Sequence, residues 1–131
     1  MFNKKEENWR IGQIGESIAT KFLESKGFSV VDRNVRYTFG EVDIVAKRAQ
    51  IVHFVEVKSI REANVSRETS TGGGYRPEEL VHPAKLAKIA RVANVYMDRF
   101  SANTEYQIDV IAVFIDEERR VGRCRMTENV N

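Results

Sequence analysis

Apolar residues recur along the chain at intervals that predict a helix, three strands, a second helix and two further strands. The first helix is expected from about Glu7 to Lys26, where isoleucines recur at helical spacing and Gly27 follows as a stop. Shorter apolar runs predict strands, the last of them at a sheet edge, over residues 28–34, 41–47, 51–59, 106–115 and 121–126. Pro83 suits the first turn of a second helix that ends near Phe100. This alternation predicts an α/β fold, or an α+β one, with one mixed β-sheet flanked by helices in the order α-β-β-β-α-β-β.

Composition narrows the class of protein. The 131 residues are 42% hydrophobic and 31% charged, which excludes a disordered chain and a membrane protein and predicts one domain over residues 1–131. The charged N-terminus has no apolar segment typical of a secretory signal, and the single cysteine, Cys124, excludes a disulfide framework and a cysteine-rich zinc site. We therefore expect a cytoplasmic protein. Its 21 basic and 19 acidic residues give a net charge of +2, which neither supports nor excludes a nucleic-acid partner.

One segment has little that could be buried. Residues 66–76 contain three consecutive glycines, Gly72, Gly73 and Gly74, which give the backbone great freedom. We expect a mobile surface loop over residues 60–77, which is either a functional lid or a tolerated insertion.

Two neighbouring strands carry charged residues within otherwise apolar runs. Side chains alternate between the faces of a strand, so Glu56 and Lys58 share one face of the strand 51–59. If the turn before this strand centres on residues 49–50, Asp43 of the preceding strand lies opposite Glu56. The Cβ atoms of opposed residues are about 4.5–5.5 Å apart. Two carboxylates at that distance repel each other unless a cation bridges them.

A divalent metal ion would remove this repulsion. Mg²⁺ prefers oxygen ligands and is commonly held by one or two carboxylates together with a substrate phosphate. Lys58, one pleat beyond Glu56, could then contact the attacking water or the charge that develops on a scissile phosphate. The alternative is a half-solvated hairpin in which Glu56 and Lys58 take part in surface ion pairs.

The order of motifs along the chain resembles a known family. From Ile11 to Val113 the sequence contains, in order, GESIATKFLESKGF, RNVRYTFGEVDIVA, HFVEVKS, VHPAKLAKIARVANVYM and IDVIAV. This series resembles the YraN-like family of predicted endonucleases, which is similar in turn to the archaeal Holliday-junction resolvases and to the wider restriction-endonuclease-like superfamily. The resemblance implies a restriction-endonuclease-like fold, a mixed sheet flanked by helices.

The resemblance also implies roles for individual residues. Asp43 and Glu56 match the metal-binding carboxylates, and Lys58 matches the catalytic lysine. The backbone carbonyl of Val57 would be a further metal ligand, and Glu16 resembles an additional acidic residue contributed by the first helix. On a helical projection, however, Glu16 lies more than about 100° from the centre of the apolar stripe, a position that a solvated glutamate would also occupy.

Five basic residues are candidates for contact with nucleic acid. Lys85, Lys88 and Arg91 recur every three residues and therefore form one stripe beside the apolar face of the second helix. Arg33 and Arg36 lie just before the acidic strand. Both sets could contact phosphates, although a solvated helix face has the same pattern.

Three other polar residues are expected to have ordinary roles. Glu41 is interpreted as an exposed carboxylate near Asp43, and His53 as packed or hydrogen-bonded. His82 is expected at the entrance of the second helix, just before its proline.

These observations favour an Mg²⁺- or Mn²⁺-dependent endonuclease that hydrolyses DNA phosphodiester bonds, on branched or otherwise structured DNA. The alternative is a nucleic-acid-binding module whose nuclease site is weak or unused. A protein-interaction domain that uses the exposed sheet edge at residues 121–126 is a third hypothesis. By analogy with the resolvases, a homodimer is expected if the protein cuts junctions symmetrically.

Overall fold

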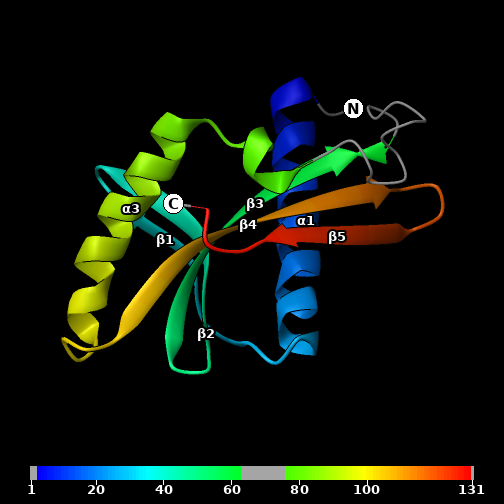
Figure 1. Ribbon diagram of the computed structural model, residues 1–131. Helices are drawn as coiled ribbons and strands as arrows, with labels where there is room; N and C mark the ends of the chain where they lie inside the picture. The colour runs from blue at the N-terminus through cyan, green and yellow to red at the C-terminus, as the bar shows by residue number, and fades with distance from the viewer. Residues whose placement is uncertain (1–2, 63–75, 131) are drawn as a thin grey trace.

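A five-stranded sheet with one long helix on each face forms the molecule (Figure 1). The computed structural model describes residues 3–62 and 76–130. The helices and strands are, in chain order, α1 (Lys4–Ser25), β1 (Ser29–Tyr37), β2 (Gly40–Arg48), β3 (Ile51–Arg61), the short 3-10 helix η2 (Pro77–Leu80), α3 (Pro83–Tyr96), the 3-10 turn η3 (Met97–Arg99), β4 (Glu105–Asp116) and β5 (Val121–Thr127). The predicted fold class and the predicted order of elements are thus confirmed.

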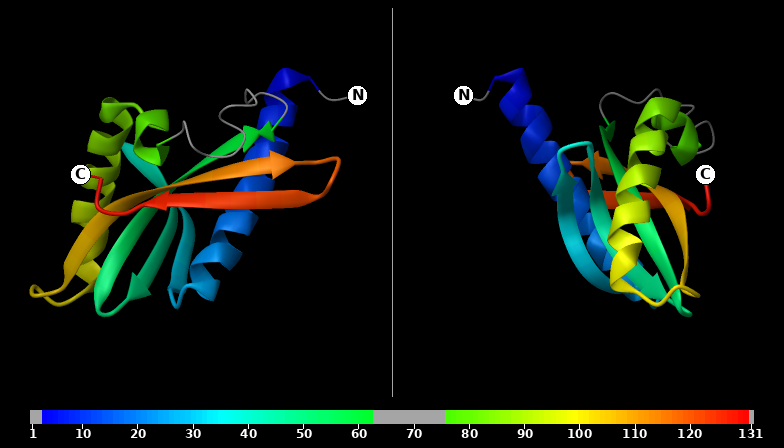
Figure 2. Two further views of the ribbon diagram at one scale, coloured as in Figure 1. Left: turned by 45° about the vertical axis from the view of Figure 1, so that its right-hand side comes forward. Right: turned by 90° about the vertical axis from the view of Figure 1, so that its left-hand side faces the viewer.

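The sheet is mixed because the chain crosses over once. Its spatial order is β1-β2-β3-β4-β5, with β3 and β4 parallel and the other neighbours antiparallel. The crossover from β3 to β4 contains α3. This helix lies on one face of the sheet and α1 lies on the other (Figure 2). Each helix covers its own apolar core: Ala19 and Leu23 of α1 pack in one, and Ile89 and Val92 of α3 in the other.

No helix in the described part of the chain combines the length and the apolar character needed to cross a membrane.

Local signals set the ends of the two helices. Asn3 begins α1, because its side chain accepts a hydrogen bond from the backbone N–H of Glu6 at 2.8 Å. Gly27, with φ of 90°, ends the same helix in a conformation that residues with a Cβ rarely adopt. His82 caps α3 by accepting from the N–H of Ala84 at 3.0 Å, which confirms its expected place at the helix entrance.

The turn between β2 and β3 sets the register of the two acidic strands. Ala49 and Gln50 both have positive φ values, 50° and 65°, so they form a tight turn of the type whose twist matches that of a hairpin. Pairing then runs from Arg48 opposite Ile51 to Ile44 opposite Val55. This is the predicted register.

The structure differs from the sequence prediction at the expected loop. Of residues 60–77, positions 63–75 lie outside the described residues. Ile60 and Arg61 still belong to β3, and Pro77 begins η2. The strand continues beyond its predicted end because its pairing with β4 runs on to Arg61, opposite Ile115. Arg61 also forms ion pairs with Glu7 at 2.6 Å and Glu117 at 2.8 Å.

Candidate metal and nucleic-acid site

Asp43 is fixed beside β3 at the point where backbone pairing between β2 and β3 ends. The last pair of this ladder is Ile44 with Val55. One residue further along β2, Asp43 Oδ2 accepts a hydrogen bond from the backbone N–H of Val57 at 2.8 Å. A carboxylate thus binds an N–H of β3, and this contact places the half-buried Asp43 next to Glu56.

Glu56 is the most unusual group of the site. Its side chain is only 5% exposed, and Oε1 is buried without any hydrogen-bond partner. Oε2 accepts from the Lys85 ammonium group at 2.7 Å. Burial, and next the negative charge of Asp43, raise the pKa of Glu56 from 4.5 to about 8, although Lys85 acts in the opposite direction. The ionised form of Glu56 is therefore disfavoured beside Asp43, even with Lys85 in contact.

Glu16 of α1 is buried in the same neighbourhood. It is 5% exposed, and its carboxylate binds the guanidinium group of Arg33 at 3.2 Å. Burial and the charge of Asp43 both raise the pKa of Glu16. The alternative of a solvated glutamate is therefore wrong. The helical projection did not reveal this burial, because Arg33 of β1 covers a flank of α1 that the apolar stripe does not reach.

Lys58 faces an open cavity together with Glu56. The cavity has a volume of about 630 Å³ and lies between the first turns of α1 and the end of β3. Besides Glu56 and Lys58, its lining includes Lys4 and Lys85. A phosphate group in this cavity would therefore meet three ammonium groups beside one buried carboxyl group.

The predicted nucleic-acid residues have three different environments. Arg36, Lys85 and Lys88 line a second cavity, also of about 630 Å³, beside the β1–β2 turn. Arg91 lies over the ring of Phe39, with the guanidinium carbon 5.0 Å from the ring centroid. Arg33 is bound to Glu16 instead. Lys85 lines both cavities.

Comparison with known proteins assigns the chain to a family. The family model described as "Uncharacterised protein family UPF0102" matches residues 15–113. The chain belongs to the UPF0102 family. It is 38% identical over 130 residues to a UPF0102 protein of Desulforapulum autotrophicum, a match that covers 98% of this chain and 96% of the relative. A UPF0102 protein of Campylobacter fetus is 36% identical over 107 residues, covering 82% of this chain and 86% of the relative.

The resemblance to the YraN-like family is thereby confirmed. The region matched by the UPF0102 model contains every residue predicted from that resemblance, from Glu16 to Lys58, and also the five basic candidates, the last of which is Arg91. It also contains Lys85, whose contact with Glu56 the sequence did not reveal. The stripe on the second helix drew attention to Lys85 as a phosphate ligand. Its place on Glu56 depends on how α3 packs over the sheet, for which the sequence has no local signal.

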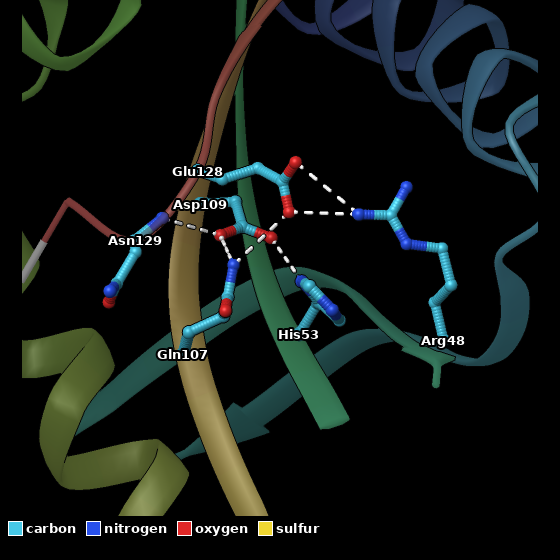
Figure 3. A network of polar contacts seen from close by, with 6 residues as sticks. All are labelled: Arg48, His53, Gln107, Asp109, Glu128 and Asn129. Carbon is cyan, nitrogen blue, oxygen red and sulfur yellow. Dashed lines mark hydrogen bonds and ion pairs between the residues drawn. The ribbon is translucent and has the colours of Figure 1, made fainter. Parts of the chain in front are cut away.

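A different cluster in this UPF0102 protein has the spacing of a metal site (Figure 3). The cluster consists of His53, Asp109 and Glu128, whose ligand atoms all lie within 4.8 Å of one another. It is the group of three or more His, Cys, Asp or Glu residues with this spacing in residues 3–62 and 76–130. Asp43, Glu56 and Glu16 do not form such a three-residue group in this structure.

Hydrogen bonds already satisfy that cluster. Asp109 Oδ2 lies 2.6 Å from His53 Nδ1, while Oδ1 accepts from Gln107 at 2.8 Å and from the backbone N–H of Asn129 at 2.9 Å. Glu128 is paired with Arg48 at 3.1 Å. The network binds the C-terminal segment to β3 and β4, and the interpretation of His53 as a hydrogen-bonded residue is confirmed. Glu41 likewise has its expected place, exposed and 3.6 Å from Arg36.

Proposed function

We propose that this protein is a nuclease that hydrolyses DNA phosphodiester bonds with the help of Mg²⁺ or Mn²⁺. The observation that carries the proposal is the buried, unpartnered Oε1 of Glu56 next to Asp43. A buried carboxyl oxygen without a partner costs about 1–3 kcal/mol, so its retention needs an explanation. A divalent cation bound by Glu56 and Asp43 would supply the missing partner.

The donors at this site suit a hard cation. Carboxylate oxygens are the ligands that Mg²⁺ and Mn²⁺ prefer, whereas no sulfur or imidazole donor of the described residues lines the cavity. Asp43 and Glu56 would hold the ion, with the Val57 carbonyl and Glu16 as the further ligands expected from the family resemblance. Once bound, the ion supplies positive charge that polarises a phosphoryl oxygen and favours ionisation of water.

The lysines of the cavity would act on the phosphate and the water. Lys58 faces the cavity from the same strand as Glu56, where it would orient the attacking water or stabilise charge on the phosphate. Attack in line with the P–O3′ bond would break that bond and leave a 5′-phosphate. Lys85, which lines both cavities, would neutralise a neighbouring phosphate.

The basic surface beyond the site would position the substrate. Arg36 and Lys88 line the second cavity, and Arg91 is exposed beside it. Contacts from such residues to phosphates carry no sequence preference, which suits an enzyme that recognises the shape of branched or structured DNA. Symmetric cutting of a junction would need two copies of the chain.

A nucleic-acid-binding module without catalysis is the second candidate. It is favoured by the 2.7 Å contact of Lys85 with Glu56, because an ammonium group already provides that carboxyl with one cation. Such a protein would bind DNA through the same basic residues and would use Glu56 only to position Lys85.

Cleavage assays separate the two candidates. The purified protein is incubated with single-stranded, linear duplex and four-way-junction DNA, in Mg²⁺, Mn²⁺ or a chelator. The nuclease proposal predicts cutting that needs the metal and is lost in Asp43→Ala and Lys58→Ala, while Glu41→Ala, a neighbouring exposed acid, still cuts. Salt-sensitive binding to the same DNA without any cutting would support the binding module and contradict the nuclease.

A further inference from the structure

The most exposed large apolar side chain in the described part of the protein lies near the candidate site. Trp9 of α1 is 68% exposed and is the single tryptophan of the chain. It precedes residues 15–113, the region that the UPF0102 model matches. A solvated indole on a helix that has a buried face available needs a reason, since Trp is normally highly buried.

Helix geometry places Trp9 on the flank of α1 that faces the acids. Trp9 and Glu16 are seven residues apart, so they point in nearly the same direction about the axis and are separated by about 10 Å along it. Glu16 is the residue of α1 whose charge interacts with Asp43. Gly12, one turn after Trp9 on a neighbouring part of the helix surface, lines the cavity that contains Glu56 and Lys58.

The helix leaves free space between Trp9 and Glu16. A Cβ atom added to Gly12 would meet nothing within 4 Å, so packing does not require a glycine there. Glycine inside a helix is less stable than alanine by about 1 kcal/mol, and at this position no close packing contact requires the smaller residue. The position is open to solvent and to a ligand, directly beside the indole and above the acids.

The charges around this space indicate the chemistry of the ligand. Lys4, Lys58 and Lys85 line the cavity together with the acids Glu7 and Glu56. The exposed Trp9 lies one helical turn from Gly12, which also lines it. Ammonium groups bind phosphates, and an exposed aromatic ring stacks on a nucleobase. A nucleotide strand offers both groups at neighbouring positions, but only where its bases are unpaired, since a fully paired duplex hides the faces of its bases.

We propose that Trp9 stacks on an unpaired base of a nucleic-acid strand whose phosphates enter the cavity of Lys4, Lys58 and Lys85. This inference rests on the proposed function and narrows its substrate to single-stranded DNA or to unpaired segments of branched DNA. Trp9 binds substrate here and takes no part in the chemistry at phosphorus.

The single tryptophan makes the stacking directly measurable. The full-length protein is titrated, in a chelator that prevents cutting, with fluorescein-labelled oligothymidylate and with a blunt DNA hairpin. Anisotropy reports binding, and selectively excited tryptophan emission from the same protein with unlabelled DNA reports stacking. We expect oligothymidylate to quench Trp9, and the hairpin to bind more weakly and leave the emission unchanged.

Variants distinguish stacking from a general loss of binding. Base–aromatic stacking predicts that Trp9→Ala binds oligothymidylate about 5- to 100-fold more weakly, and that Trp9→Phe recovers most of this loss. Trp9→Ala leaves the salt dependence of binding unchanged, whereas Lys4→Ala reduces its slope by about one. Val95→Ala, which shortens another exposed apolar side chain on α3, serves as the control and binds like wild type.

The possible outcomes separate this inference from the nuclease proposal. Three results would each overturn the inference. The first is binding of oligothymidylate without a change in the Trp9 emission, the second is equal affinity of wild type and Trp9→Ala for it, and the third is no binding at all. Metal-dependent cutting with unchanged emission would overturn the stacking alone. Quenching of Trp9 by a protein that never cuts DNA would support the stacking and overturn the nuclease.

Discussion

Replacing Glu56 by glutamine should stabilise the protein, and more so as the pH rises. The Glu56 side chain is 5% exposed, lies beside Asp43 and has one oxygen without a partner. Burial and the charge of Asp43 raise its pKa to about 8. The folded protein therefore binds this proton more tightly than the unfolded chain does, so stability decreases as the pH rises from about 4.5 to about 8.

The size of the effect follows from the rise in pKa. A tenfold change in proton affinity corresponds to about 1.4 kcal/mol, so the rise from 4.5 to about 8 costs on the order of 5 kcal/mol when the carboxylate is fully ionised. At about pH 5.5 only about 1 kcal/mol of this cost is present, and at about pH 8.5 nearly all of it. Glu56→Gln removes the charge, so its advantage over wild type should grow by about 3 kcal/mol between these two pH values.

Urea unfolding followed by circular dichroism, with a chelator present at both pH values, measures this difference. Glu41→Gln is the matched control, because Glu41 is exposed and paired with Arg36 on the neighbouring strand. Its stability relative to wild type should not change with pH in this range. A constant difference between Glu56→Gln and wild type, or a loss of stability in Glu56→Gln that grows with pH, would refute the account of the buried carboxyl.

Three further predictions concern the framework around the site. An added Cβ at Gly15 would lie 2.8 Å from the Cβ of Ser59, so Gly15→Ala should lower the free energy of unfolding by about 1–3 kcal/mol. An added Cβ at Gly12 would meet nothing within 4 Å, so Gly12→Ala should raise the free energy of unfolding by up to about 1 kcal/mol. Equal effects of the two substitutions in urea denaturation would contradict this. Asp109→Ala removes the partner of the buried His53, the acceptor of the Asn129 N–H and one of two acceptors of Gln107, and it should cost about 3 kcal/mol in the same assay. An unchanged midpoint would count against the network. Burial raises the pKa of Cys124 to about 11, so this thiol should resist iodoacetamide at neutral pH in the native state and react in urea; rapid native labelling would exclude such burial.

The elements and the acidic pair could be predicted from the sequence because their signals are local. Alternation along β2 and β3, together with a two-residue turn at Ala49 and Gln50, was enough to place Asp43 opposite Glu56. The turn has unfavourable residues for its conformation, but the strands on both sides are rich in Val and Ile, and a one-residue slip would move these side chains to the other face.

The partners of the acids could not be predicted, because they come from distant elements. Lys85 reaches Glu56 only through the packing of α3 over the sheet, and Arg33 reaches Glu16 across the gap between β1 and α1. A sequence pattern assigns both basic residues to a surface for phosphates. Tertiary packing instead pairs each of them with a buried carboxyl group. Substituting either residue would therefore leave a buried carboxyl group without its partner, in addition to removing a candidate contact with phosphate.

The most direct test of the proposed metal site is the anomalous X-ray scattering of Mn²⁺ in crystals of the protein. We expect one manganese peak between the carboxyl groups of Asp43 and Glu56, which is absent in crystals of Asp43→Ala. We also expect no peak at His53, Asp109 and Glu128, since hydrogen bonds and the Arg48 ion pair already satisfy those groups. Manganese bound at His53, Asp109 and Glu128 alone, or at neither place, would contradict the central claim.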